Sequence, residues 1–375
     1  MTDERELSET RIPVRLGVVQ RVLPAYRVPF FDALARACSD GMGLFAGSPR
    51  AEEAIENGAV PLVAQRAQAH NRHLLRGPLY LCWQSGLLRW LEEWQPEALV
   101  VEANPRYLNT PRAVAWMHAR HRPVIGWGLG VPQPSGRLDL FRSAARRRFL
   151  GQFDALITYS RQGAGEYSRA GIAPECIFVA PNAMAPRPVE PPLERPDEFA
   201  GGQATLLYVG RLQARKRVDL LLRACAALPE GTRPRIWIVG DGPARAELET
   251  LAHHHYPEAQ FLGAKHGVEL EPFFMAADLF VLPGTGGLAV QQAMSYGLPV
   301  VVGEGDGTQN DLVRPGNGWQ IEPGNLERLT HVLTGAISDA RRLRRMGRES
   351  YRIVNEEINL EKMVDVFAEA IASVL

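Results

Sequence analysis

A proline-rich segment near the middle of the chain divides it in two. The segment reads AMAPRPVEPPLERPDEFAGGQ, with prolines at positions 186, 188, 191, 192 and 196. Proline has no backbone N–H to donate, so a helix interior or a central strand cannot accommodate this pattern. We therefore predict a semi-extended linker over 185–202, with one domain over 12–184 and another over 203–358.

Short β-branched runs alternate with longer helical patterns on both sides of this linker, which predicts parallel sheets covered by helices. The expected strands are 14–19, 98–101, 123–126 and 155–158 before the linker, and 205–209, 235–239, 279–282 and 299–302 after it. From about residue 341 the pattern is helical, with a break near 355–359. The apolar residues of the last helix recur at helical spacing and need a surface to cover.

Composition disfavours several classes of protein. The 375 residues carry no formal net charge, whereas a nucleic-acid-binding chain would usually be basic. Four cysteines, Cys38, Cys82, Cys176 and Cys225, lie far apart without zinc-ligand spacing, which is typical of a reducing compartment. The polar start and the lack of a long apolar run predict no signal peptide and no spanning helix. We expect a cytoplasmic protein, soluble or lying on the inner membrane face.

The segment LLYVGRLQARKRVDLLLRA is the first that indicates chemistry. A buried strand ends at Gly210, Arg211 follows, and Lys216 comes just before a helix. Both cations are therefore expected at the carboxyl edge of a parallel sheet, where α/β folds bind ligands. Two positive charges at such an edge suit a diphosphate, although a solvated basic loop would look the same.

Two glycine-rich turns follow strands in the same half. IVGDGP places Gly240 at a tight strand-to-helix turn, which is a weak indication alone. In ADLFVLPGTGGLAVQQAM, Gly284, Thr285, Gly286 and Gly287 precede a helix that begins near Leu288. Unobstructed backbone N–H groups at a helix start form a ready anion site, but a plain tight turn is the alternative.

Taken together, these segments resemble family 4 glycosyltransferases of the GT-B fold. GRLQARK, IVGDGP, FLGAK, ADLFVLPG and QAMSYGLPVV occur in the family's order and at matching spacing over about 205–330. The first domain resembles the family only in outline, through PAYRVPFFDALA and YSRQGAGEYSRAGIAPECIFVAPNA. The resemblance implies an α/β GT-B protein: two Rossmann-like, doubly wound domains, an interdomain cleft, and a C-terminal helix, 360–375, that crosses back to the first domain.

The resemblance also implies where a nucleotide-sugar donor binds. Arg211 and Lys216 would hold the diphosphate and stabilise it as a leaving group, without a metal or another cofactor. The nucleotide base would lie near Gly263 and Val268. The full set of implied donor-binding residues is Gly210, Arg211, Lys216, Gly240, Gly263, Val268, Gly284, Thr285, Gly286, Gly287, Leu288 and Gln292.

The sequence departs from the family's pattern at the sugar. The family usually carries two glutamates where this chain has Gly284 and Gln292, and a histidine where Leu129 stands. After the strand 98–101, a histidine-containing segment is replaced by Glu102, Ala103 and Asn104. Glu102 is therefore a candidate catalytic base or sugar ligand, and a solvated or capping carboxylate is the alternative.

The acceptor side is the least defined. Residues 70–94 are rich in Leu, Trp and Arg, and a later basic helix carries Arg137, Arg142, Arg146, Arg147 and Arg148. Such helices can rest on anionic lipid, or they can be a core-packed helix and a solvated charged face.

The resemblance thus favours a metal-independent glycosyltransferase of the kind used in polysaccharide biosynthesis. It would move a hexose to a glycan, lipid-linked or natural-product acceptor with retention of configuration. A catalytically faded nucleotide-binding partner subunit and a nucleotide-sugar epimerase remain as alternatives.

Overall fold

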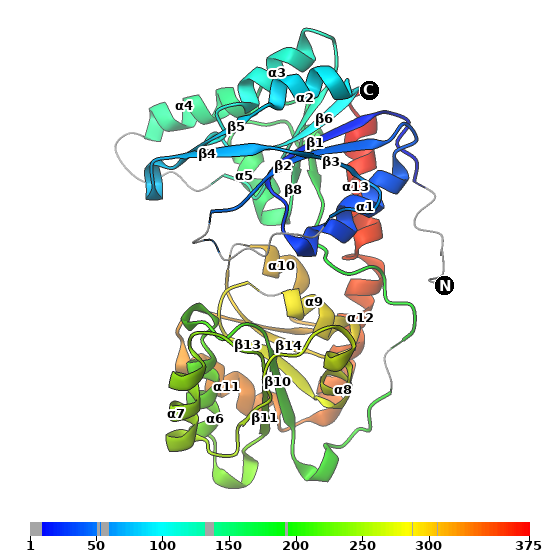
Figure 1. The fold of residues 1–375 in the computed structure, drawn as a ribbon. Helices are drawn as coiled ribbons and strands as arrows, with labels where there is room; N and C mark the ends of the chain where they lie inside the picture. Colours follow the sequence, from blue (N-terminus) through cyan, green and yellow to red (C-terminus); the bar gives the residue numbers. More distant parts are fainter. Residues whose placement is uncertain are drawn as a thin grey trace. The chain divides into compact units, whose positions relative to one another are not determined.

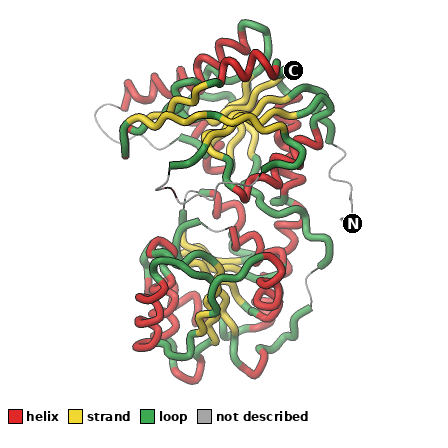
Figure 2. Tube along the Cα trace, in the orientation of Figure 1, coloured by secondary structure: helices red, strands yellow, loops and turns green. Residues whose placement is uncertain are grey.

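The computed structural model describes residues 10–50, 53, 60–131, 139–191, 194–286, 288–305 and 307–375. The chain divides into two compact units, Met1–Met184 with Leu360–Leu375, and Ala185–Asn359. In each unit the strands form a central layer with helices on both faces (Figure 2). The two units are described separately below.

The first unit contains a seven-stranded parallel sheet in the order β3-β2-β1-β6-β7-β8-β9 (Figure 1). These strands are β3 (Gln65–Gln68), β2 (Met42–Gly47), β1 (Leu16–Val22), β6 (Ala98–Glu102), β7 (Val124–Gly128), β8 (Ala155–Thr158) and β9 (Ile177–Val179). The helices are α1 (Val28–Ala37), α2 (Leu87–Trp94), α3 (Thr110–His118), α4 (Asp139–Leu150), α5 (Arg161–Arg169) and α13 (Leu360–Ala372). The sequence order reverses at β1 and β6, which is the switch point of a doubly wound sheet.

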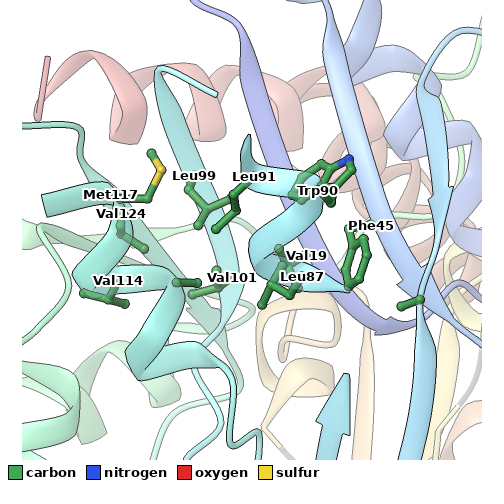
Figure 3. Close-up of a cluster of buried hydrophobic side chains, with 12 residues drawn as sticks. Val19, Phe45, Leu87, Trp90, Leu91, Leu99, Val101, Val114, Met117 and Val124 are labelled. Carbon is green, nitrogen blue, oxygen red and sulfur yellow. The ribbon is translucent and has the colours of Figure 1, made fainter. Parts of the chain in front are cut away.

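Apolar side chains bury both faces of this sheet. On one face, Val101 belongs to a cluster with Leu91 of α2 and Met117 of α3 (Figure 3). On the other, Phe367 of α13 packs against Phe30 of α1 and against Trp127, with ring centroids 5.0 and 4.9 Å apart. The C-terminal helix therefore belongs to the core of the first unit, as the amphipathic pattern of that helix requires.

The second unit contains a six-stranded parallel sheet in the order β12-β11-β10-β13-β14-β15. Its strands are β12 (Gln260–Phe261), β11 (Arg235–Val239), β10 (Thr205–Val209), β13 (Leu279–Leu282), β14 (Val300–Gly303) and β15 (Gly318–Ile321). Its helices are α6 (Val218–Ala226), α7 (Arg245–His255), α8 (Glu271–Ala276), α9 (Leu288–Ser295), α10 (Thr308–Leu312), α11 (Leu326–Ala336) and α12 (Ala340–Glu356). Strands β10 and β13 flank the switch point here.

The proline-rich segment lies along the second unit. The guanidinium group of Arg195 donates to the carbonyl oxygens of Phe274 and Tyr296, each at 2.8 Å. The buried Arg344 donates to the carbonyl of Pro196 at 2.8 Å and pairs with Asp278 at 2.7 Å. Hydrogen bonds from two arginine side chains thus hold this segment against the second unit, where the prolines have no N–H groups to donate.

The strands expected at 155–158, 205–209, 235–239 and 279–282 are confirmed to the residue, and the other four differ by a few residues at their ends. The expectation of a helix across 70–94 is wrong in its first half. An antiparallel hairpin, β4 (His70–Leu74) and β5 (Leu81–Ser85), occupies that stretch before α2 begins. In the described part of the chain, no helix is both long and apolar enough to span a bilayer.

Candidate functional site

Loops that follow four neighbouring strands come together at the carboxyl edge of the second sheet. A Cβ atom on Gly240 would lie 1.9 Å from the carbonyl oxygen of Gly210, so the loops after β10 and β11 touch through their backbones. The N–H of Gly240 also donates to the carbonyl of Gly263, after β12, at 2.8 Å. Only glycine permits this approach at Gly240, where φ is +147°.

Lys216 is the most unusual charged residue at this edge. Its side chain is only 8 % exposed, and its ammonium group donates to the carbonyl oxygens of Thr285 and Gly286 at 3.0 and 3.1 Å. Among the described residues no carboxylate pairs with it. Burial, reinforced by the charge of Arg215, lowers the pKa of Lys216 to about 8. A buried cation without a counter-charge marks a place for an anion.

Gly284 supports the loop that contains Lys216. A Cβ atom on Gly284 would lie 2.1 Å from the carbonyl oxygen of Arg215 and 2.5 Å from the Cα atom of Lys216. The N–H of Thr285 donates to the same Arg215 carbonyl at 3.1 Å. The loops after β10 and β13 are therefore in backbone contact, and no side chain fits at position 284 in this arrangement.

The other expected donor-binding residues differ in how exposed they are. Arg211 is exposed, and its carbonyl accepts a hydrogen bond from the Tyr208 hydroxyl at 3.2 Å. Gly286 adopts a φ of +70° just before α9, which begins at Leu288 as expected; Gly287 lies outside the described residues. Gln292 is half-buried one turn into α9, and Val268 is exposed in the turn Gly267–Leu270.

The first unit has a separate pocket of about 550 Å³ at the carboxyl ends of β6 and β7. Its polar and aromatic lining comes from Glu102, Asn104, Arg106, Tyr107, Trp127, Arg146, Phe149 and Tyr159, and Leu129 is also in its wall. A carboxylate oxygen of Glu102 accepts the Arg21 backbone N–H at 2.5 Å. Burial raises the pKa of Glu102 to about 7, although Arg21 and Arg27 oppose the shift.

A carboxyl group whose pKa is near neutrality can either accept or donate a proton under ordinary conditions. The structure places Glu102 in the wall of a pocket and not in bulk solvent, and its carboxylate also accepts a backbone N–H, as the capping alternative expects. Sequence reasoning did not single out Arg27, Trp127 or Tyr159, which cluster beside it. The sequence carries no direct signal for this cluster. Trp127 lies within β7, Tyr159 follows β8 and Arg27 precedes α1, and only the order of the strands in the sheet brings them together. Among the described residues no group of three or more His, Cys, Asp or Glu side chains could hold a metal ion.

Comparisons with known proteins give a family match over part of the chain and a likeness of fold. Residues 191–353 match the family described as group 1 glycosyl transferases. The chain is 34% identical over 140 residues to the sulfoquinovosyl transferase SQD2 of Arabidopsis thaliana, a match covering 36% of this chain and 26% of that protein. The chain thus spans about a quarter of the length of that relative.

Two further comparisons extend over most of the chain. It is 22% identical over 304 residues to the lipopolysaccharide core biosynthesis glycosyltransferase LpsE of Rhizobium meliloti, a match covering 76% of this chain and 87% of that protein. The crystal structure of Anabaena Alr3699/HepE in complex with UDP superposes with a TM-score of 0.68 at 16% identity, covering 96% of this chain and 99% of that one. At this identity the structural likeness shows the fold.

Proposed function

We propose that this chain transfers a hexose-type sugar from a nucleoside diphosphate donor to an acceptor hydroxyl, because its residues 191–353 match the group 1 glycosyl transferases and it has the GT-B fold. The observation that carries this proposal is Lys216, a buried ammonium group held by two carbonyl oxygens and by no described carboxylate. A linked phosphate supplies the missing negative charge.

The donor diphosphate would bind across the loops after β10 and β13. Lys216 would contribute a point charge and Arg211 a planar guanidinium group, which suits the spread of phosphate oxygens. The first N–H groups of α9, which follow Gly286, would add partial positive charge. All three stabilise negative charge more as it grows on the departing diphosphate, which lowers the barrier to transfer.

In the transfer itself, the bond between the anomeric carbon and the diphosphate oxygen breaks and a bond to the acceptor oxygen forms. We propose that configuration is retained and that a donor phosphate oxygen takes the acceptor proton. The acceptor would occupy the Glu102 pocket, where Glu102 would bind a hydroxyl of the reacting sugars and orient it. No metal is required by this scheme, since Arg211, Lys216 and a helix start neutralise the diphosphate.

We also propose that the acceptor is presented at an anionic membrane surface. No Asp or Glu occurs between Glu56 and Glu92, whereas four arginines do. Near the tip of the β4–β5 hairpin, Leu75 and Leu79 are 61% and 69% exposed, and Arg76 stands between them. Exposed leucines beside arginines suit the boundary between lipid headgroups and acyl chains.

A panel of UDP, GDP, ADP and dTDP sugars, tested by thermal shift, decides the donor, because a bound ligand stabilises the fold by mass action. Arg211→Ala and Lys216→Ala should abolish the shift given by the preferred donor. Arg223→Ala is the matched control, since it removes an exposed arginine on α6 of the same unit. If no donor stabilises the wild type, or if both site variants retain its full shift, the proposal is wrong.

A further inference from the structure

Arg27 is a buried arginine whose guanidinium group lacks a complete set of partners. It is 8% exposed and lies between β1 and α1. No described residue accepts a hydrogen bond from its Nη1 atom or forms an ion pair with it. Arginine is always charged in proteins and is seldom buried unpaired, so the arrangement lacks an acceptor.

Aromatic rings surround this guanidinium group. Its central carbon lies 5.2 Å from the ring of Trp127 and 5.1 Å from the ring of Tyr159, and both residues line the Glu102 pocket. The third ring, Tyr26, is 5.7 Å away and 41% exposed, so it is the contact nearest solvent. Stacking fixes the plane of the guanidinium group but satisfies none of its N–H donors.

A second donor beside Arg27 is also unsatisfied. The indole Nε1 atom of Trp127 is buried and has no partner among the described residues. Indole nitrogen can only donate, as can guanidinium nitrogen. Arg27 and Trp127 therefore both lack an oxygen atom that would accept a hydrogen bond from them.

The backbone around Arg27 adds positive electrostatic potential to that of the guanidinium group. The turn Ala25–Arg27 runs directly into α1, and neither has an acidic residue in its first turn or a side chain that caps it. The positive end of the helix dipole is therefore not neutralised locally. Glu102 is the nearby carboxyl group, and the carboxylate oxygen described above is used by the Arg21 N–H.

We propose that Arg27 is the binding residue for an oxyanion, a phosphate or a carboxylate, carried by the acceptor that enters the Glu102 pocket. This rests on the proposed role of that pocket in binding the acceptor. The planar guanidinium group would take two oxygens of the anion, and Tyr26 would move aside to admit it. The enzyme would therefore select acceptors that carry a negative charge and discriminate against neutral ones.

The test uses the whole 375-residue chain with Arg211→Ala and Lys216→Ala, so that the donor site cannot hold the probe. Inorganic phosphate and acetate are each titrated by calorimetry at constant ionic strength. At least one should bind, and which one does identifies the acceptor's group. Adding Arg27→Gln should weaken that binding at least about tenfold, as expected for a lost charge-assisted hydrogen bond.

Arg112→Gln is the matched control, because Arg112 also stacks on a tryptophan ring, that of Trp83, at 4.9 Å. If circular dichroism shows that Arg27→Gln does not fold, Arg27→Lys is used instead and should likewise weaken anion binding at least about tenfold. Lysine keeps the positive charge but loses the planar pair of donors. Absence of binding by both anions, or equal binding after the Arg27 substitution, would overturn the inference. Neither result would touch the donor assignment, which the nucleotide-sugar panel tests separately.

Discussion

Donor affinity should depend on pH through a single side chain, Lys216. Its pKa is lowered to about 8 in the unliganded protein because its ammonium group is buried and lies near Arg215. Only the protonated form attracts the donor diphosphate, and binding restores the missing counter-charge. Affinity is therefore full below pH 8 and is lost as the pH rises through that value.

The size of the effect follows from the fraction of protonated lysine. With a pKa of about 8, that fraction falls roughly tenfold between pH 7 and pH 9, so the Kd should rise about tenfold, equivalent to about 1.4 kcal/mol. A nucleotide sugar has no phosphate group that titrates in this range, so the charge of its diphosphate stays constant. Isothermal titration calorimetry of the preferred donor at pH 7, 8 and 9 measures the change directly.

Lys216→Arg separates this cause from others. Arginine stays charged throughout the range, so the variant should bind with nearly the same Kd at pH 7 and pH 9, whatever its absolute affinity. A flat wild-type curve would refute the reasoning, as would an equally steep curve in Lys216→Arg. The first result would mean that Lys216 is not desolvated, and the second that another group titrates.

Three further results are expected. Gly284→Ala should weaken donor binding and lower the free energy of unfolding by about 1–3 kcal/mol, measured by denaturant titration, because its Cβ atom would meet the Arg215 carbonyl. Glu102→Gln should remove a titration near pH 7 from the pH profile of transfer, since the carboxyl that faces Arg21, Arg27 and the Tyr107 and Tyr159 hydroxyls is no longer ionisable. Leu75→Ser with Leu79→Ser should reduce co-sedimentation with anionic phosphatidylglycerol vesicles several-fold, without changing donor binding.

Each of these results has a control or an outcome that would contradict it. Gly335→Ala lies within α11, where a Cβ atom meets nothing within 4 Å, and should leave donor binding unchanged. An unchanged pH profile in Glu102→Gln would exclude Glu102 as the group that titrates. Vesicle binding that survives both serine substitutions, or that is equal on neutral lipid, would contradict the hairpin assignment.

Sequence alone could predict most of the second unit because its signals are local. A buried strand followed by glycine and a helical pattern specifies β10, its turn and α6 without reference to distant residues. The hairpin at 70–85 could not be recognised in this way. Its leucines and tryptophans have a composition typical of a helix, and only pairing such as that of His73 with Cys82 reveals strands.

In the candidate site, too, the sequence predicts the features that depend on neighbouring residues but not those that depend on distant ones. Spacing placed Arg211 and Lys216 at one sheet edge, but the burial of Lys216 depends on Thr285 and Gly286, which are about seventy residues away. Likewise, the position of Arg27 in the sequence says nothing of Trp127 and Tyr159, because their contact is made by the order of strands in the sheet. Contacts between residues far apart in the sequence bury these side chains, and burial determines properties such as the pKa of Lys216.

Gly284 connects a feature of the local sequence with a long-range contact in the structure. It stands where the family resemblance implies a glutamate near the donor sugar. In the structure it lets the loop after β13 come within backbone contact of Arg215 and Lys216, which a glutamate side chain would prevent. The close approach brings the carbonyl oxygens of Thr285 and Gly286 to the ammonium group and buries it. The close packing at Gly284 thus accompanies the burial that lowers the pKa of Lys216 to about 8, so donor binding in this chain should be sensitive to pH.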